Sequence, residues 1–118
     1  MPLSLSPAPD VLATIRAYLE QEILPGLRDD KWFTVKVAAN MLATIERELR
    51  QAPEANAAER TRLAVLTGAE GTLADLNRVL AEAIRAGGIA DDDPRLLDHL
   101  RRTTAAALAI NNPQWLAR

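Results

Sequence analysis

Apolar residues along this chain recur at intervals of three and four positions, the spacing that gives an α-helix one hydrophobic face. The first such series follows Asp10, which can cap a helix, and stops before Pro25-Gly26. Its apolar positions are Leu12, Ile15, Leu19 and Ile23. No alternating pattern typical of a β-strand and no internal repeat occurs, so the pattern predicts only helices.

Helix-breaking residues between the later apolar series predict two further helices in the middle of the chain. A second helix should begin at Asp29 or Asp30 and run to about Gln51, ahead of Pro53. A third should start near Pro53 and end at Gly68. The core face of the second is expected at Val35, Ala38, Leu42, Ile45 and Leu49, and that of the third at Leu63 and Leu66.

The fourth and fifth helices have the clearest start signals. Thr72 and Asp75 stand three residues apart, as in a capping box, and Gly87-Gly88 should end the fourth helix. Asp93 is expected to cap the fifth, with Pro94 at the first helical position, where proline is favoured. The expected core faces are Leu73, Leu76, Leu80 and Ile84 on the fourth helix, and Leu97, Leu100, Thr104 and Leu108 on the fifth.

This arrangement predicts an all-α fold, a single-domain antiparallel bundle of about five helices joined by short loops. The domain is expected to span residues 10–118, after a flexible N-terminal segment at 1–9. The length of 118 residues suits one domain. Apolar residues make up 48 % of the chain but aromatic residues only 3 %, which favours helix over strand.

The second helix carries a further apolar strip, about 100° around the helix from its expected core face. Either this is the central helix of the bundle, or the strip meets a partner, which could be a second copy in a homo-oligomer or another protein. Trp32, at the start of this helix, and Trp115, in the C-terminal tail, could likewise either pack within the bundle or contact a partner. Asn40 lies at the edge of the strip. The candidate interface residues are therefore Trp32, Phe33, Val37, Asn40, Met41 and Trp115.

Motifs that carry chemistry are nearly absent. The chain has no cysteine and one histidine, His99, so a metal site would depend on carboxylates. Asp91–Asp93 lack the ligand spacing of a calcium loop and suit the start of a helix. Serine occurs only at Ser4 and Ser6, and no glycine pattern predicts a phosphate site. We therefore expect no catalytic activity, no cofactor and no metal.

Charge and hydropathy narrow the range of partners. The formal net charge is −2 and the basic residues are spread along the chain, so no basic surface for nucleic acid is expected. No apolar run has the length of a membrane span, and the N-terminus lacks the features of a signal peptide. The sequence thus predicts a cytoplasmic protein with no nucleic-acid or membrane partner.

Three stretches of the chain carry a family resemblance. They are "LEQEILPGL" with "KVAANMLATIEREL", then "LADLNRVLAEAIRAGGIADDDPRLLDHLRRTT", then "LAINNP". In this order and spacing, over roughly residues 10 to 113, they resemble an uncharacterised bacterial family of small helical domains of unknown function. Such domains are found beside or fused to aminoglycoside-phosphotransferase-like kinases, often near acyl-CoA dehydrogenases.

The resemblance implies a non-catalytic accessory or interaction module whose partner is a phosphotransferase-like kinase in acyl-CoA-related metabolism. It supplies no catalytic residues. The alternative is a helical bundle that binds a small apolar ligand, such as an acyl chain, between its helices.

Overall fold

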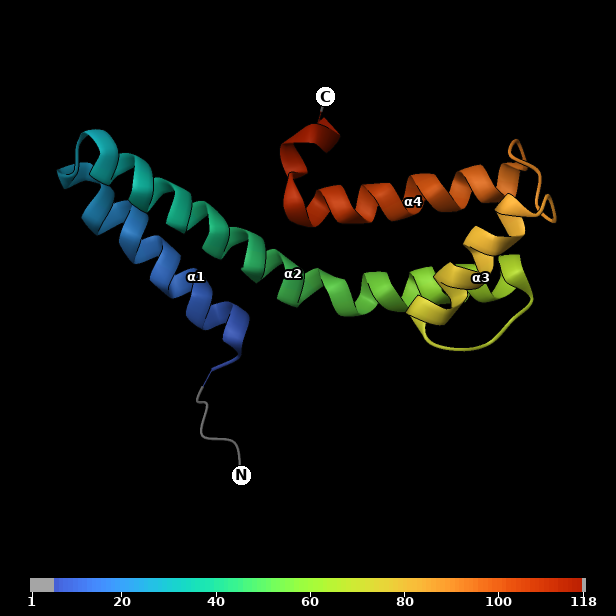
Figure 1. Cartoon of the computed structure of the whole chain (residues 1–118). Coiled ribbons are helices and arrows are strands. Elements are labelled where there is room, and N and C mark those ends of the chain that lie inside the picture. Colours follow the sequence, from blue (N-terminus) through green and yellow to red (C-terminus); the bar gives the residue numbers. More distant parts are fainter. Residues whose placement is uncertain (1–5, 118) are drawn as a thin grey trace. The chain divides into compact units, whose positions relative to one another are not determined.

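Helices form every regular element of residues 6–117, the part of the chain described by this computed structural model (Figure 1). The expected all-α fold class is confirmed. The α-helices of this part are α1 (Ala8–Tyr18), α2 (Asp29–Thr67), α3 (Leu73–Arg85) and α4 (Pro94–Asn111). Shorter helical turns are the π-helical η1 (Leu19–Ile23), the 3₁₀-helical η2 (Leu24–Gly26) and the 3₁₀-helical η3 (Pro113–Ala117).

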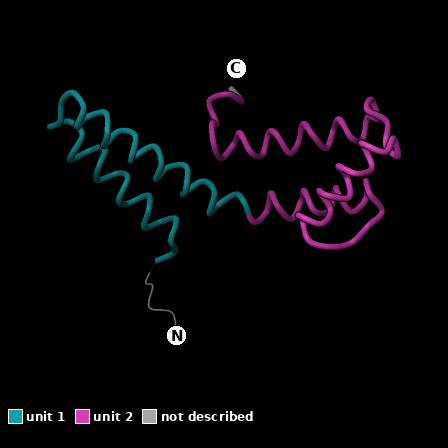
Figure 2. The backbone as a smooth tube through the Cα atoms, in the orientation of Figure 1, with its two compact units in different colours: residues 1–52 teal, residues 53–118 magenta. Residues whose placement is uncertain are grey.

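The chain divides into two compact units, residues 1–52 and residues 53–118 (Figure 2). Unit 1 holds α1 and the first part of α2, and unit 2 holds the rest of α2 with α3 and α4. The expected boundary between a flexible segment and a domain stays a prediction, because residues 1–5 lie outside the described part of the chain. Within that part, α1 already begins at Ala8.

One helix, α2, replaces the second and third helices that the sequence predicts. The expected break at Pro53 is wrong, because this proline lies inside α2. A proline in a helix interior removes one backbone hydrogen bond and crowds the carbonyl four residues earlier. The residues on both sides of it are mostly Ala, Glu, Arg, Leu and Gln, which are strong helix formers, so the helix continues. The described chain therefore has four α-helices instead of five.

Within unit 1, α1 and α2 run antiparallel and are joined by ion pairs. Arg50 Nη2 lies 2.9 Å from Asp10 Oδ1, and Arg16 Nη2 lies 3.2 Å from Glu46 Oε2. The buried side chains among the described residues of this unit are Leu24 and Ala39. Unit 1 thus has very little core of its own.

The face of α2 that is buried in unit 1 differs from the expected stripe. Ala39 is completely buried, whereas Ile45 and Leu49 of the expected stripe are exposed. Glu46 lies two turns after Ala39 on the same side of the helix, and Arg16 of α1 binds it. A small alanine and an ion pair therefore set the face toward α1, about 100° from the face that the leucine spacing predicts.

Unit 2 has a small core at one end of its helices. Its buried members come from α2, α3 and α4 and are Leu63, Leu76, Leu80 and Leu96. Leu66, Leu73 and Ile84 pack against this core, so the expected core faces of α3 and of the end of α2 are confirmed.

The expected caps in unit 2 are also confirmed. Asp75 N donates to Thr72 Oγ1 over 3.1 Å and Thr72 N donates to Asp75 Oδ2 over 3.2 Å, which is the predicted capping box. Asp93 caps α4 by accepting from Arg95 N over 2.9 Å. Gly68 closes α2 at a φ of 69°, where glycine is favoured.

The buried face of α4 differs from the expected one. Leu96 and His99 are buried, whereas Leu97 and Leu100 are exposed. The predicted face followed the larger number of leucines. On the adjacent face Leu96 packs into the leucine core of unit 2, and Arg62 of α2 hydrogen-bonds to His99 and Thr103. The series that lies toward α2 has spacings of three and four residues and consists of Leu96, His99, Thr103, Ala106 and Ile110.

Candidate functional site

An exposed row of large apolar side chains runs along α2 in unit 1. They occur at every fourth position and are Phe33, Val37, Met41, Ile45 and Leu49. We call this row the α2 ridge. Phe33 is 64 % exposed and Met41 61 % exposed, so the ridge is open in the isolated chain. A row at this spacing is the kind of ridge that fits into the grooves of another helix.

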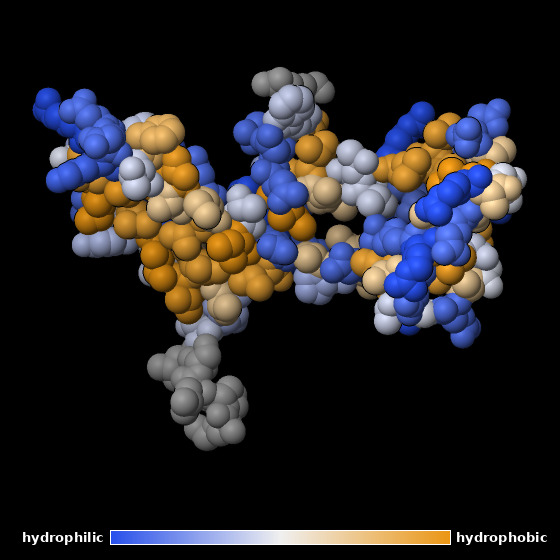
Figure 3. Space-filling model, viewed as in Figure 1, coloured by the Kyte–Doolittle hydropathy of each residue, from blue (hydrophilic) through white to orange (hydrophobic). Residues whose placement is uncertain are grey.

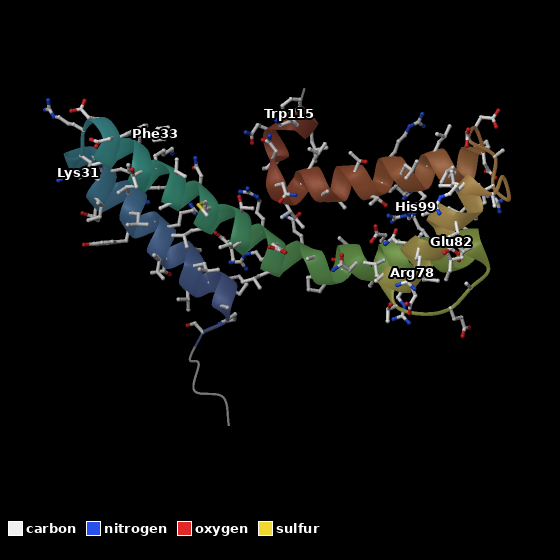
Figure 4. The ribbon with its side chains drawn as sticks, viewed as in Figure 1. Lys31, Phe33, Arg78, Glu82, His99 and Trp115 are labelled. Carbon is white, nitrogen blue, oxygen red and sulfur yellow. The ribbon has the colours of Figure 1, made fainter. Side chains whose placement is uncertain are left out.

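Helix geometry places the middle of the α2 ridge away from α1. At 100° per residue, Val37 and Met41 each lie within about 20° of the point opposite the buried Ala39. Figure 4 shows Phe33 on the side of α2 that points away from α1. Hydrophobic residues also gather on the face of unit 1 turned toward the viewer in Figure 3. The covered and the open sides of α2 are therefore distinct.

The structure brings part of the sequence-predicted interface together. Phe33, Val37 and Met41 share the α2 ridge, while Trp32 is exposed at the start of the same helix. Asn40 is exposed, and its backbone carbonyl accepts a hydrogen bond from the Thr44 hydroxyl. Ile45 and Leu49 belong to the ridge but were not predicted for it, because their spacing also fits a core face.

Trp115 belongs to unit 2 and not to the unit that carries the α2 ridge. It lies in η3, its side chain is 53 % exposed, and its backbone N–H donates to the carbonyl of Asn112 over 3.0 Å. Its assignment to an interface stays a prediction.

A groove of about 430 Å³ lies in unit 2 between the second part of α2 and the first turns of α4. Its lining is mostly apolar, with contributions from Val65, Leu66 and Pro94. We call it the Arg62 groove, because Arg62 and His99 supply polar groups to it. Its size falls in the range of small-molecule sites in proteins. Figure 4 shows His99 on the side of α4 that faces α2.

Arg62 reaches across from α2 to two side chains of α4. Its Nε donates to His99 Nδ1 over 3.3 Å, and its Nη2 donates to Thr103 Oγ1 over 3.2 Å. Because Nδ1 accepts a hydrogen bond, the proton of the neutral imidazole sits on Nε2. Burial lowers the pKa of His99 below its ordinary value, and the positive charge of Arg62 lowers it further. His99 is thus neutral at pH 7 and carries its N–H on Nε2.

No carboxylate lies within ion-pair distance of Arg62 in residues 6–117. The other charged residues of the groove are paired, Arg95 with Asp93 at 3.2 Å and Asp98 with Arg102 at 2.9 Å. Arg62 is only partly exposed and also lines a second cavity of about 150 Å³. The groove therefore holds a partly buried cation that makes no direct ion pair within this part of the chain, while Glu59 lines the second cavity beside it.

Sequence analysis missed Arg62 as a site residue. The signal was present in the register of two helices, because Ala55, Glu59, Arg62 and Leu66 repeat at spacings of four, three and four on α2. The residues of α4 that face α2 also repeat at spacings of three and four, and Arg62 of α2 lies opposite His99 and Thr103 of α4. Spacing within one helix does not reveal which second helix it meets.

Other chemistry has little structural basis in the described residues. Across residues 6–117, no group of three His, Asp or Glu side chains is placed to hold a metal ion. Within the same range, no helix has both the length and the apolar character needed to cross a membrane. The arrangement offers two surfaces with binding potential, the α2 ridge and the Arg62 groove.

Comparison with known proteins identifies a family but no function. The model of a family described as "Domain of unknown function (DUF6285)" matches residues 25–115. No curated protein and no solved structure matches the chain.

Proposed function

The chain belongs to the DUF6285 family, and we propose that it acts as a non-catalytic interaction module whose partner is a phosphotransferase-like kinase. The observation that carries the proposal is the α2 ridge. An open row of Phe, Val, Met, Ile and Leu side chains is a feature of surfaces that bind another protein. The choice of a kinase as the partner, and of acyl-CoA-related metabolism as its setting, rests on the resemblance of the quoted sequence stretches to the kinase-associated bacterial family.

Packing in unit 1 supports an outside partner for the ridge. Leu24 and Ala39 are the buried side chains of its described part, so α1 covers only one side of α2. Complete burial of a fully exposed large apolar side chain is favourable by about 1.5–3 kcal/mol, and the ridge residues, which are 39–64 % exposed, would each contribute part of this. Burial of several ridge residues would therefore give a partner helix a substantial driving force.

Affinity capture tests this proposal. The tagged chain is incubated with lysate of its source cells, and the captured proteins are quantified by mass spectrometry. We expect a phosphotransferase-like kinase at near-equal stoichiometry with the wild-type chain and its loss with the double variant F33S/M41S. The matched control is V65S/V79S, which changes two exposed valines of unit 2 and should keep the kinase.

Failure would take one of two forms. Recovery of the tagged chain without a kinase, at a concentration where it is folded, would contradict the proposed partner. Equal capture by F33S/M41S and by V65S/V79S would contradict the role of the α2 ridge while leaving the partner in place.

The Arg62 groove favours a second candidate function, the binding of a small apolar ligand. Its volume of about 430 Å³ and its mostly apolar lining suit a ligand of the size of a short acyl chain. The groove and the ridge lie in different units, so the two candidate functions are tested by variants at different residues.

A further inference from the structure

We propose that the Arg62 groove binds a carboxylate that carries a compact apolar body, with the carboxylate at the guanidinium of Arg62. This inference rests on the second candidate function, ligand binding in unit 2, and adds the chemical class of the ligand. It is independent of the kinase partner.

Several donor groups of Arg62 have no partner within the described chain. Arg62 uses one N–H each of Nε and Nη2 for His99 and Thr103, which leaves both N–H groups of Nη1 and the second N–H of Nη2. No side-chain nitrogen or oxygen among residues 6–117 is both buried and without a hydrogen-bond partner. The free Nη1 atom of Arg62 therefore keeps contact with solvent, and Arg62 lines the groove.

The arrangement of these donors is fixed before any ligand arrives. Arg62 is held by two hydrogen bonds to α4, and His99 is 3 % exposed, so neither side chain is free to swing into bulk water. A carboxylate has two oxygens and accepts well from the paired N–H groups of a guanidinium. A preorganised guanidinium also loses less conformational entropy on binding than a mobile side chain.

Charge favours an anion over a neutral polar group. Arg62 is partly buried, and burial of a cation without an anion costs free energy that a bound carboxylate offsets. The remaining charges of the groove are already paired within the chain, at Arg95 with Asp93 and at Asp98 with Arg102. One unpaired positive charge suits one negative charge on the ligand.

The rest of the groove determines the body of the ligand. Val65, Leu66 and Pro94 line it, and contact with these side chains favours an apolar chain over a sugar or a nucleotide. A volume of about 430 Å³ accommodates an apolar body of eight carbon atoms. An eight-carbon carboxylate, octanoate, is therefore a suitable probe.

Calorimetric titration of the full-length chain at pH 7.5 tests the inference with three probes. Octanoate carries charge and apolar body, octanol carries the body alone, and inorganic phosphate carries charge alone. We expect octanoate to bind at least tenfold more tightly than octanol and phosphate. Arg62→Met should remove the preference over octanol, and Arg60→Met, two residues away and exposed on the same helix, should retain it.

A second measurement uses the wild-type chain and does not depend on the folding of a variant. His99 is the one histidine of the sequence, so its ring protons are assigned without ambiguity in an NMR titration. The charged groups that act on it are Arg62, Glu59 and Asp98. A bound carboxylate adds a negative charge beside the ring and should raise the pKa of His99, whereas octanol should leave this pKa unchanged.

Each outcome decides between distinct conclusions. Equal affinity for octanoate and octanol, without a change in the His99 pKa, would overturn the carboxylate and leave apolar ligand binding in place. Tight phosphate binding that matches octanoate would overturn the apolar body. No binding of any probe to the folded chain would overturn both this inference and the second candidate function.

Discussion

Arg62 of α2 donates a hydrogen bond from Nε to Nδ1 of His99 of α4, across 3.3 Å and a sequence separation of 37 residues. Both side chains are polar, and each lies on the face of its helix that is turned toward the other helix. It fixes the tautomer of the imidazole and holds the guanidinium at the groove wall. The same contact gives the buried His99 a hydrogen-bond partner, and Arg62 makes no ion pair with an acidic residue in the described chain.

Stability should fall on mild acidification because of His99. Its pKa in the folded chain lies below the ordinary value of 6.5, so the unfolded chain binds more protons than the folded chain at and below that pH. Stabilisation from the neutral imidazole is complete above about pH 7.5 and decreases as the pH falls from there toward 5. Urea unfolding followed by circular dichroism across this range measures the effect.

The matched variant for this prediction is His99→Gln, which cannot titrate and can still accept from Arg62. Since the chain has one histidine, the variant should lose most of the pH dependence between 7.5 and 5. An unchanged pH dependence in His99→Gln would show that other groups cause it.

Two adjacent leucines of α4 test which face is buried. Leu96 is 3 % exposed within the core of unit 2, whereas Leu97 is exposed. Leu96→Ala should lower the free energy of unfolding by about 2–5 kcal/mol, and Leu97→Ala by less than about 1 kcal/mol. Urea unfolding of both variants measures the difference. A larger cost for Leu97→Ala would mean that the face with Leu97 and Leu100 is the buried one.

The capping box at the start of α3 should contribute measurably to stability. Thr72→Ala removes the side-chain acceptor for Asp75 N and should cost about 0.5–2 kcal/mol in thermal or urea unfolding. Thr61→Ala is the control, because Thr61 is exposed within α2 and its hydroxyl bonds back to the carbonyl of Ala57. That change should be close to neutral, since alanine is the better helix former. Equal costs for both changes would contradict a role of the cap.

Local signals in the sequence were sufficient for part of the fold. Thr72, Asp75 and Asp93 make contacts within three residues, so their capping roles can be predicted without knowledge of the remaining chain. The leucine face of α3 is equally local, because the helix has a single apolar side that contains Leu76 and Leu80.

Features that depend on distant parts of the chain were predicted less well. The series on α2 and on α4 each have two apolar sides, and which one is buried depends on contacts such as Arg16 with Glu46 or Arg62 with His99. Pro53 is a break signal by itself, but the helix formers on both sides outweigh it. The candidate interface shares this problem, because spacing identifies the apolar row and not the surface that covers it.

Oxidation of Met41 tests the role of the α2 ridge most directly. The chain has two methionines, Met1 and Met41, and Met41 is 61 % exposed in the middle of the ridge. Mild peroxide converts an accessible methionine to its sulfoxide, and mass spectrometry of the peptide with Met41 gives the rate. We predict that the rate in the dilute isolated chain is at least fivefold higher than in the complex recovered by affinity capture. An equal rate in both samples would contradict the central claim that a partner covers the α2 ridge.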